Sequence, residues 1–117
     1  MKILLFNPPR SPENKILEHA PADALPFIHK KLIGPPLGLL TVAAAVKDFD
    51  VTVIDLKGEY DIHPDAPGLN DLVLSYLQEY KPNLVGVTFI ASELYYGLEI
   101  FRVSKRFDPE ILTVAGG

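Results

Sequence analysis

The sequence predicts an α/β domain with a Rossmann-like or flavodoxin-like doubly wound parallel sheet. Four short segments are apolar almost throughout, which is typical of parallel strands that helices cover on both faces. Longer segments with helical spacing of apolar residues separate them. The resulting order, βαβαβαβ, gives one parallel sheet because such crossovers are right-handed. A length of 117 residues fits a single small domain over residues 1–117.

The predicted strands are rich in aliphatic and β-branched residues, which favour a pleated and buried backbone. None of them alternates strictly between polar and apolar residues, so we expect no strand to have one face open to water. The strands cover residues 3–6, 51–54, 84–90 and 111–114.

The first predicted helix is the most apolar of three. It begins near Pro36, since proline suits the first helical turn, and it continues to Val46. Apolar residues lie nearly all round it, so we expect it to be deeply buried, with its alanines close to the sheet. The other two helices are amphipathic and end before a proline; they cover residues 69–80 and 96–107.

Two connections are unusual for this fold. The link over residues 7–35 far exceeds the ~2–6 residues typical of a strand-to-helix loop, and loops of such length are usually functional or disordered. It is flanked by Asn7-Pro8-Pro9 and by Pro36-Leu37-Gly38, at the end of one strand and the start of a helix. Those positions form the ligand edge of a doubly wound sheet. We expect the second connection, residues 57–68, to be a polar loop.

Composition excludes several classes of function. The net charge of -4 gives no basic footprint, so we expect no nucleic-acid partner. No apolar run approaches the ~20 residues that span a bilayer, and the first apolar run is too short for a signal peptide. We therefore expect a cytoplasmic protein without a membrane span. The absence of cysteine excludes disulfides, a thiolate nucleophile and a cysteine-ligated iron–sulfur cluster within this chain.

Common catalytic and nucleotide motifs are missing. There is no G-x-S-x-G elbow, no Walker A loop, and no G-x-G-x-x-G after the first strand. Asp55 ends the second strand, where dinucleotide folds often have an acidic residue that binds a ribose, but without those glycines we interpret it as a strand-end cap or loop anchor. A receiver domain is rejected, because Asn7 and Thr88 end the strands where that class needs carboxylates. The three histidines match no metal spacing.

A weak cobalt-ligand signal is also present. Asp61-Ile62-His63 matches the start of the D-x-H-x-x-G motif of some cobalamin domains. It follows the second strand rather than the first, and Ala66 stands where the motif has glycine. We therefore do not expect His63 to ligate cobalt.

Taken together, five segments resemble the N-terminal cobalamin-binding domain of cobalamin-dependent radical SAM enzymes. The likeness covers almost the whole chain and depends on the order and spacing of its motifs. The segments are KILLFNPP at residues 2–9, PLGLLTVAA at 36–44, VTVID at 51–55, KPNLVGVT at 81–88 and VAGG at 114–117.

The resemblance implies a corrin lying across the carboxyl ends of the strands, with its nucleotide tail near the later strands. No lower histidine ligand would come from this domain, and we expect no catalytic residue and no protein metal ligand here. The residues that it implies as cobalamin-binding are Asn7, Pro8, Pro9, Pro36, Leu37 and Gly38 beside the corrin, Thr88 and Ser92 as hydrogen-bonding groups, and Gly116 and Gly117 beside the tail.

The resemblance also implies a larger parent protein. S-adenosylmethionine and a 4Fe-4S cluster would belong to a C-terminal radical SAM domain, which would carry out methyl transfer or related radical chemistry. We expect the chain to be truncated before a fifth strand, so that its exposed fourth strand promotes self-association. Two alternatives stay open: a flavodoxin-like domain that binds another nucleotide or small ligand, and a non-catalytic interaction domain.

Overall fold

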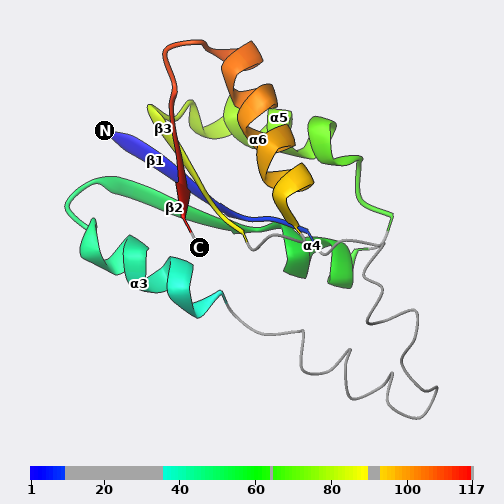
Figure 1. The fold of residues 1–117 in the computed structure, drawn as a ribbon, viewed down its shortest axis with the longest axis horizontal. Helices are drawn as coiled ribbons and strands as arrows, with labels where there is room; N and C mark the ends of the chain where they lie inside the picture. The colour runs from blue at the N-terminus through cyan, green and yellow to red at the C-terminus, as the bar shows by residue number, and fades with distance from the viewer. Residues whose placement is uncertain (10–35, 64, 90–92, 117) are drawn as a thin grey trace.

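The expected α/β architecture is confirmed. A computed structural model describes residues 1–9, 36–63, 65–89 and 93–116 (Figure 1). All strand pairs are parallel and form one four-stranded sheet in the order β2-β1-β3-β4. This is a Rossmann-like or flavodoxin-like arrangement. The strands are β1 (Lys2–Asn7), β2 (Asp50–Asp55), β3 (Leu84–Thr88) and β4 (Leu112–Gly116).

The strand register brings the carboxyl ends of all four strands to one edge. Asn7 at the end of β1 pairs with Asp55 at the end of β2, and Thr88 of β3 pairs with Gly116 of β4. At the opposite edge, the Asn83 side-chain oxygen accepts a hydrogen bond from the Lys2 backbone nitrogen at 2.8 Å. This contact joins the starts of β1 and β3 and helps to set their register.

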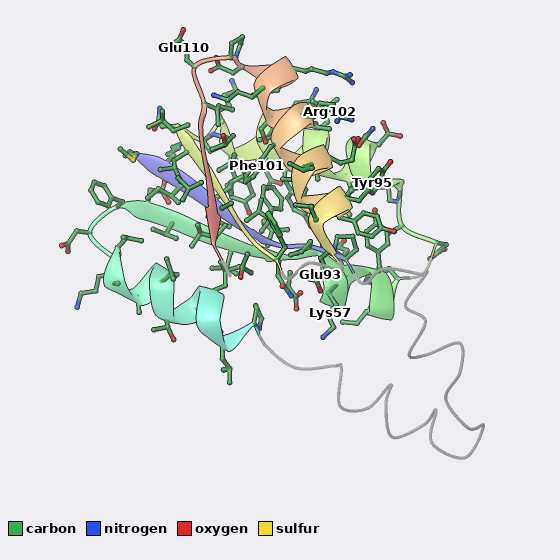
Figure 2. The ribbon with its side chains drawn as sticks, viewed as in Figure 1. Lys57, Glu93, Tyr95, Phe101, Arg102 and Glu110 are labelled. Atoms are coloured by element: carbon green, nitrogen blue, oxygen red, sulfur yellow. The ribbon has the colours of Figure 1, made fainter. Side chains whose placement is uncertain are left out.

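One face of the sheet holds the main core. Helices α5 (Leu69–Tyr80) and α6 (Leu94–Phe107) pack on this face, and both match their predicted segments within two residues. Figure 2 shows Tyr95, Phe101 and Arg102 along α6, where Arg102 pairs with the carboxylate of Glu99. No helix in the described ranges is long and apolar enough to cross a membrane. The central buried residues are Leu4, Phe6, Leu56, Val73, Leu77, Val85, Ile100 and Ile111.

The opposite face corrects one expectation. Helix α3 (Leu37–Ala45) forms as predicted, but Leu39 is its only buried residue, so the helix is not deeply buried. It packs on β1 and β2 and, within the described chain, covers only part of this face. Leu112 and Val114 of β4 consequently expose 58% and 52% of their surface. An apolar composition predicted burial, but in the described chain α3 is the one helix on this face of the four-stranded sheet, so neighbouring helices do not surround it.

A second correction concerns the connection expected to be a polar loop over residues 57–68. Its first half is a helix, α4 (Leu56–Ile62). The Asp55 carboxylate accepts a hydrogen bond from the Gly58 backbone nitrogen at 3.1 Å and caps the new helix. The prediction that Asp55 is a strand-end cap is thus confirmed. A side chain at position 58 would meet that carboxylate at 2.7 Å, so glycine permits the close approach.

Helix α5 ends in a strained residue. Lys81 adopts a left-handed conformation, with φ 48° and ψ 60°, and its backbone nitrogen donates to the Leu77 carbonyl at 2.8 Å. Pro82 follows and cannot continue the helix. In the left-handed region, the Cβ atom of any residue other than glycine crowds the backbone.

We expect Lys81→Gly to stabilise the domain by about 0.5–1 kcal/mol, because relief of the crowded conformation outweighs the added freedom of the unfolded chain. Urea denaturation gives the difference in the free energy of unfolding. Lys81→Ala is the matched control, since it removes the same charge and keeps the Cβ atom. If both variants shift stability equally, the left-handed conformation is not the cause.

Candidate functional site

A cavity of about 360 Å³ lies between the first half of α3 and the carboxyl half of the sheet. It opens on the partly covered face, beside the ends of β3 and β4. The lining residues come from three strands and one helix. They are Leu5, Gly38, Leu39, Val42, Gly86, Val87, Thr88, Val114 and Gly116.

The cavity lining is apolar. Among the described residues that line it, Thr88, at the end of β3, is the one with a polar side chain, and none is ionisable. Such a surface can hold an apolar or aromatic group and orient it through one hydroxyl. General acid–base chemistry needs a titratable side chain within hydrogen-bond reach, and this lining supplies none. The described lining is therefore suited to binding an apolar group.

The three glycines of the cavity differ in whether packing requires the absence of a side chain. Gly86 lies on the floor, where a Cβ atom would come within 2.7 Å of the Leu5 side chain, so packing requires its small size. A Cβ atom on Gly38 or Gly116 would meet nothing within 4 Å. Neither of them has a positive φ angle. In the described chain, neither packing nor backbone conformation requires glycine at these two positions. The space beside their backbone allows a ligand to approach closely.

The structure brings together three of the residues predicted to bind a ligand, namely Gly38, Thr88 and Gly116. Asn7 lies two residues beyond Leu5 on the same face of β1, because side chains alternate along a strand. It is half-buried and stands at the carboxyl end of the sheet.

The other predicted residues lie around this edge in different environments. Pro8 and Pro9 are buried, whereas Leu37 is exposed at the first turn of α3. Pro36 caps α3, and its carbonyl accepts a hydrogen bond from the Leu40 nitrogen at 3.0 Å. The remaining two predictions, Ser92 and Gly117, fall outside the described residues, as does most of the link over residues 7–35.

The sequence reasoning missed the floor and walls of the cavity. Leu5, Gly86 and Val114 are direct neighbours across three strands, so period-two alternation with the strand register would have found them. Leu39 and Val42 of α3 were treated as core because of their apolar character. Their place beside the cavity follows from the incomplete cover of this face, which composition does not reveal.

Comparison with known proteins adds a distant relative. A Pyrococcus horikoshii protein described as an uncharacterized methyltransferase is 28% identical over 85 residues, which is 72% of this chain. The chain spans only 17% of the length of that relative. No family model matches the chain, and no solved structure matches it. The chain is therefore similar to a small part of a protein named a methyltransferase.

A second hollow, of about 380 Å³, lies at the β2 edge of the sheet. Asp55, Glu59, His63 and Tyr76 contribute its polar groups. Among the described residues, no three histidine or carboxylate side chains lie together as a metal site requires. This hollow therefore offers a hydrogen-bonding network rather than a metal centre.

Two tyrosines of this region favour their neutral forms. Tyr76 donates a hydrogen bond to the Glu59 carboxylate at 2.9 Å, and partial burial together with this contact raises the pKa of Tyr76 to about 12. Partial burial and the nearby Glu59 charge also raise the pKa of Tyr60, whose hydroxyl donates to the Pro67 carbonyl at 2.7 Å. Both phenols act as donors that tie α4 and the following turn to α5.

The raised pKa of Tyr76 predicts an alkaline loss of stability. Its contribution is fully present below pH 10, the ordinary tyrosine pKa, and is lost as the pH rises through about 12. We expect the free energy of unfolding of the wild type to fall across this window. In Tyr76→Phe the same free energy should fall less. Urea denaturation at several alkaline pH values measures both slopes.

Tyr95→Phe is the matched control, because Tyr95 is an exposed tyrosine on α6 (Figure 2). It should keep the wild-type dependence on pH. An equally steep alkaline loss in Tyr76→Phe would show that the Tyr76–Glu59 contact does not carry the effect.

Proposed function

We propose that this domain binds cobalamin across the carboxyl end of its sheet and presents it for methyl transfer or related radical chemistry. The observation that carries this proposal is the pair of open glycines in one apolar cavity. Gly38 and Gly116 leave room that no residue of the described chain fills, and they flank Thr88 at the ligand edge of the sheet. Ligands of open α/β sheets bind at this edge.

The cavity fits part of such a cofactor rather than all of it. Its aliphatic walls suit the aromatic base of a nucleotide tail, and the Thr88 hydroxyl suits a polar group of that tail. Asn7 and the first turn of α3, with exposed Leu37, stand where the amide-bearing rim of a corrin would lie. When bound, cobalamin supplies a cobalt centre that carries a methyl group.

The assignment of methyl transfer is supported by the distant relative, which is named a methyltransferase. The chain has no cysteine, so an iron–sulfur cluster would have to be held by other protein. We accordingly propose a radical SAM domain, which binds S-adenosylmethionine and a 4Fe-4S cluster, as the partner that uses the cofactor. In this scheme, the present domain binds, orients and shields the cofactor.

Cobalamin binding can be tested directly with the 117-residue chain. Protein is mixed with hydroxocobalamin, separated from free ligand by gel filtration, and examined by visible spectroscopy. We expect a corrin spectrum to elute with the protein at one equivalent. Loss of all corrin, together with thermal stabilisation by a nucleotide, would instead support a flavodoxin-like domain for a different ligand.

The open glycines give a sharper test of the same site. Gly38→Ala should stabilise α3 by roughly 0.5–1 kcal/mol, since alanine favours a helix and meets no neighbour there. Gly116→Val should fold normally for the same steric reason. Both should weaken hydroxocobalamin binding, Gly116→Val by about tenfold or more, because the added side chain occupies ligand space.

Gly68→Ala is the matched control. Gly68 also has nothing within 4 Å of a built Cβ atom, but it lies at the start of α5, outside the cavity. Its substitution should leave the dissociation constant unchanged. Equal affinity in all four proteins would place the ligand elsewhere.

A further inference from the structure

Asn7 and Asp55 make a hydrogen bond whose direction is chemically determined. They are register partners at the carboxyl ends of β1 and β2, and Asn7 Nδ2 lies 2.8 Å from Asp55 Oδ1. An ionised carboxylate only accepts hydrogen bonds, so the atom of the asparagine that faces it must be the nitrogen. The amide of Asn7 is therefore held in one of its two orientations.

Asp55 is itself fixed in place. The same carboxylate oxygen accepts the Gly58 backbone nitrogen at 3.1 Å, which anchors it to the first turn of α4. Gly58 has no side chain to push the carboxylate away, since a Cβ atom there would lie 2.7 Å from Asp55 Oδ2. The orientation of Asn7 thus depends on a rigid element rather than on an exposed side chain.

The other end of the amide is the side-chain oxygen, Oδ1. No described residue donates a hydrogen bond to Asn7 Oδ1, although the side chain is half-buried. Asn7 ends β1, which lies between β2 and β3, and it shares a face of this strand with the cavity residue Leu5. A half-buried acceptor of this kind gains from a ligand that donates.

We infer that Asp55 is a positioning residue, which holds Asn7 so that its side-chain oxygen accepts a hydrogen bond from an N–H donor of the ligand. The inference rests on the proposed function, because a corrin carries primary amides around its rim that supply such donors. It specifies the hydrogen-bonding character of the site, because position 7 presents a hydrogen-bond acceptor to the ligand and not a donor. Asp55 itself need not touch the ligand.

Removal of the acceptor at position 55 tests this hydrogen-bonding character. Asp55→Ala leaves the Asn7 amide free to turn, and we expect hydroxocobalamin to bind about tenfold more weakly. Asp55→Asn keeps one oxygen that can accept from both Asn7 Nδ2 and the Gly58 nitrogen, so its affinity should stay within about threefold of wild type.

Controls separate this role from a structural one. Asparagine caps helices as well as aspartate does, so Asp55→Asn should keep α4 and the melting temperature. Asp50→Asn removes the same charge from the exposed opposite end of β2 and should bind like wild type. If Asp55→Ala binds hydroxocobalamin like wild type, or if Asp55→Asn is as weak as Asp55→Ala, the inference is wrong.

A change of ligand gives a second measurement, which separates the lost orientation of Asn7 from the lost helix cap. Heptamethyl cobyrinate is a corrinoid whose rim carries methyl esters, which accept but do not donate. Wild type should prefer hydroxocobalamin over it, and this preference should shrink about tenfold in Asp55→Ala, whereas a merely structural defect would weaken both ligands equally. An unchanged preference would overturn the inference. Failure of wild type to bind either corrinoid would instead overturn the proposed function on which it rests.

Discussion

Parallel register is the constraint on which the rest of this structure depends. Each strand pairs with its neighbour so that the carboxyl ends finish together, and the position of every strand residue at the candidate site follows from that alignment. It places Leu5 beside Gly86 and Gly86 beside Val114, which builds the cavity floor. The same alignment brings Asn7 opposite Asp55. Pairing is in turn held by burial of one sheet face, where Phe6 and Ile100 are fully enclosed.

The two faces of the sheet are used differently. One face is closed by α5, α6 and the start of α4, and it contains most of the buried apolar residues. The other carries only α3 in the described chain, with a small cluster of Ile3, Leu5 and Leu39 beneath it. This division separates the residues that hold the fold together from the residues that surround the cavity. Substitutions at Gly38 or Gly116 can therefore alter ligand space without entering the main core.

Local sequence patterns were sufficient to predict the strands and three of the helices, because continuous apolar runs and helical spacing of apolar residues are read directly from the sequence. For α3 they predicted the helix but not its burial, because its apolar character reflects a surface beside a cavity rather than a closed core. Helix α4 was also missed: it is short, contains Gly58 and depends on a cap from Asp55, so its polar residues suggest a loop. Asp55 was correctly interpreted as a cap, but its contact with Asn7 requires the register.

The positions of several cavity residues follow from chain order. Thr88 and Gly116 end their strands, and Gly38 lies in the first turn of a helix, so the parallel topology puts them at one edge of the sheet. Which glycines are open and which are packed could not be known without their neighbours. Gly86 is closed by Leu5 and Gly97 by the ring of Phe89, whereas a Cβ atom on Gly38 or Gly116 would meet nothing within 4 Å in the described chain.

The small burial of helix α3 links the stability of this helix to ligand binding in the cavity. A helix of nine residues with Leu39 as its one buried contact has a low free energy of local unfolding compared with α5 or α6. Its amide protons should therefore exchange with solvent much earlier than those of the core. Because three α3 residues form one wall of the cavity, any molecule held there also tightens this helix, by simple thermodynamic linkage. Slower hydrogen exchange of α3 would thus indicate that a ligand is bound in the cavity.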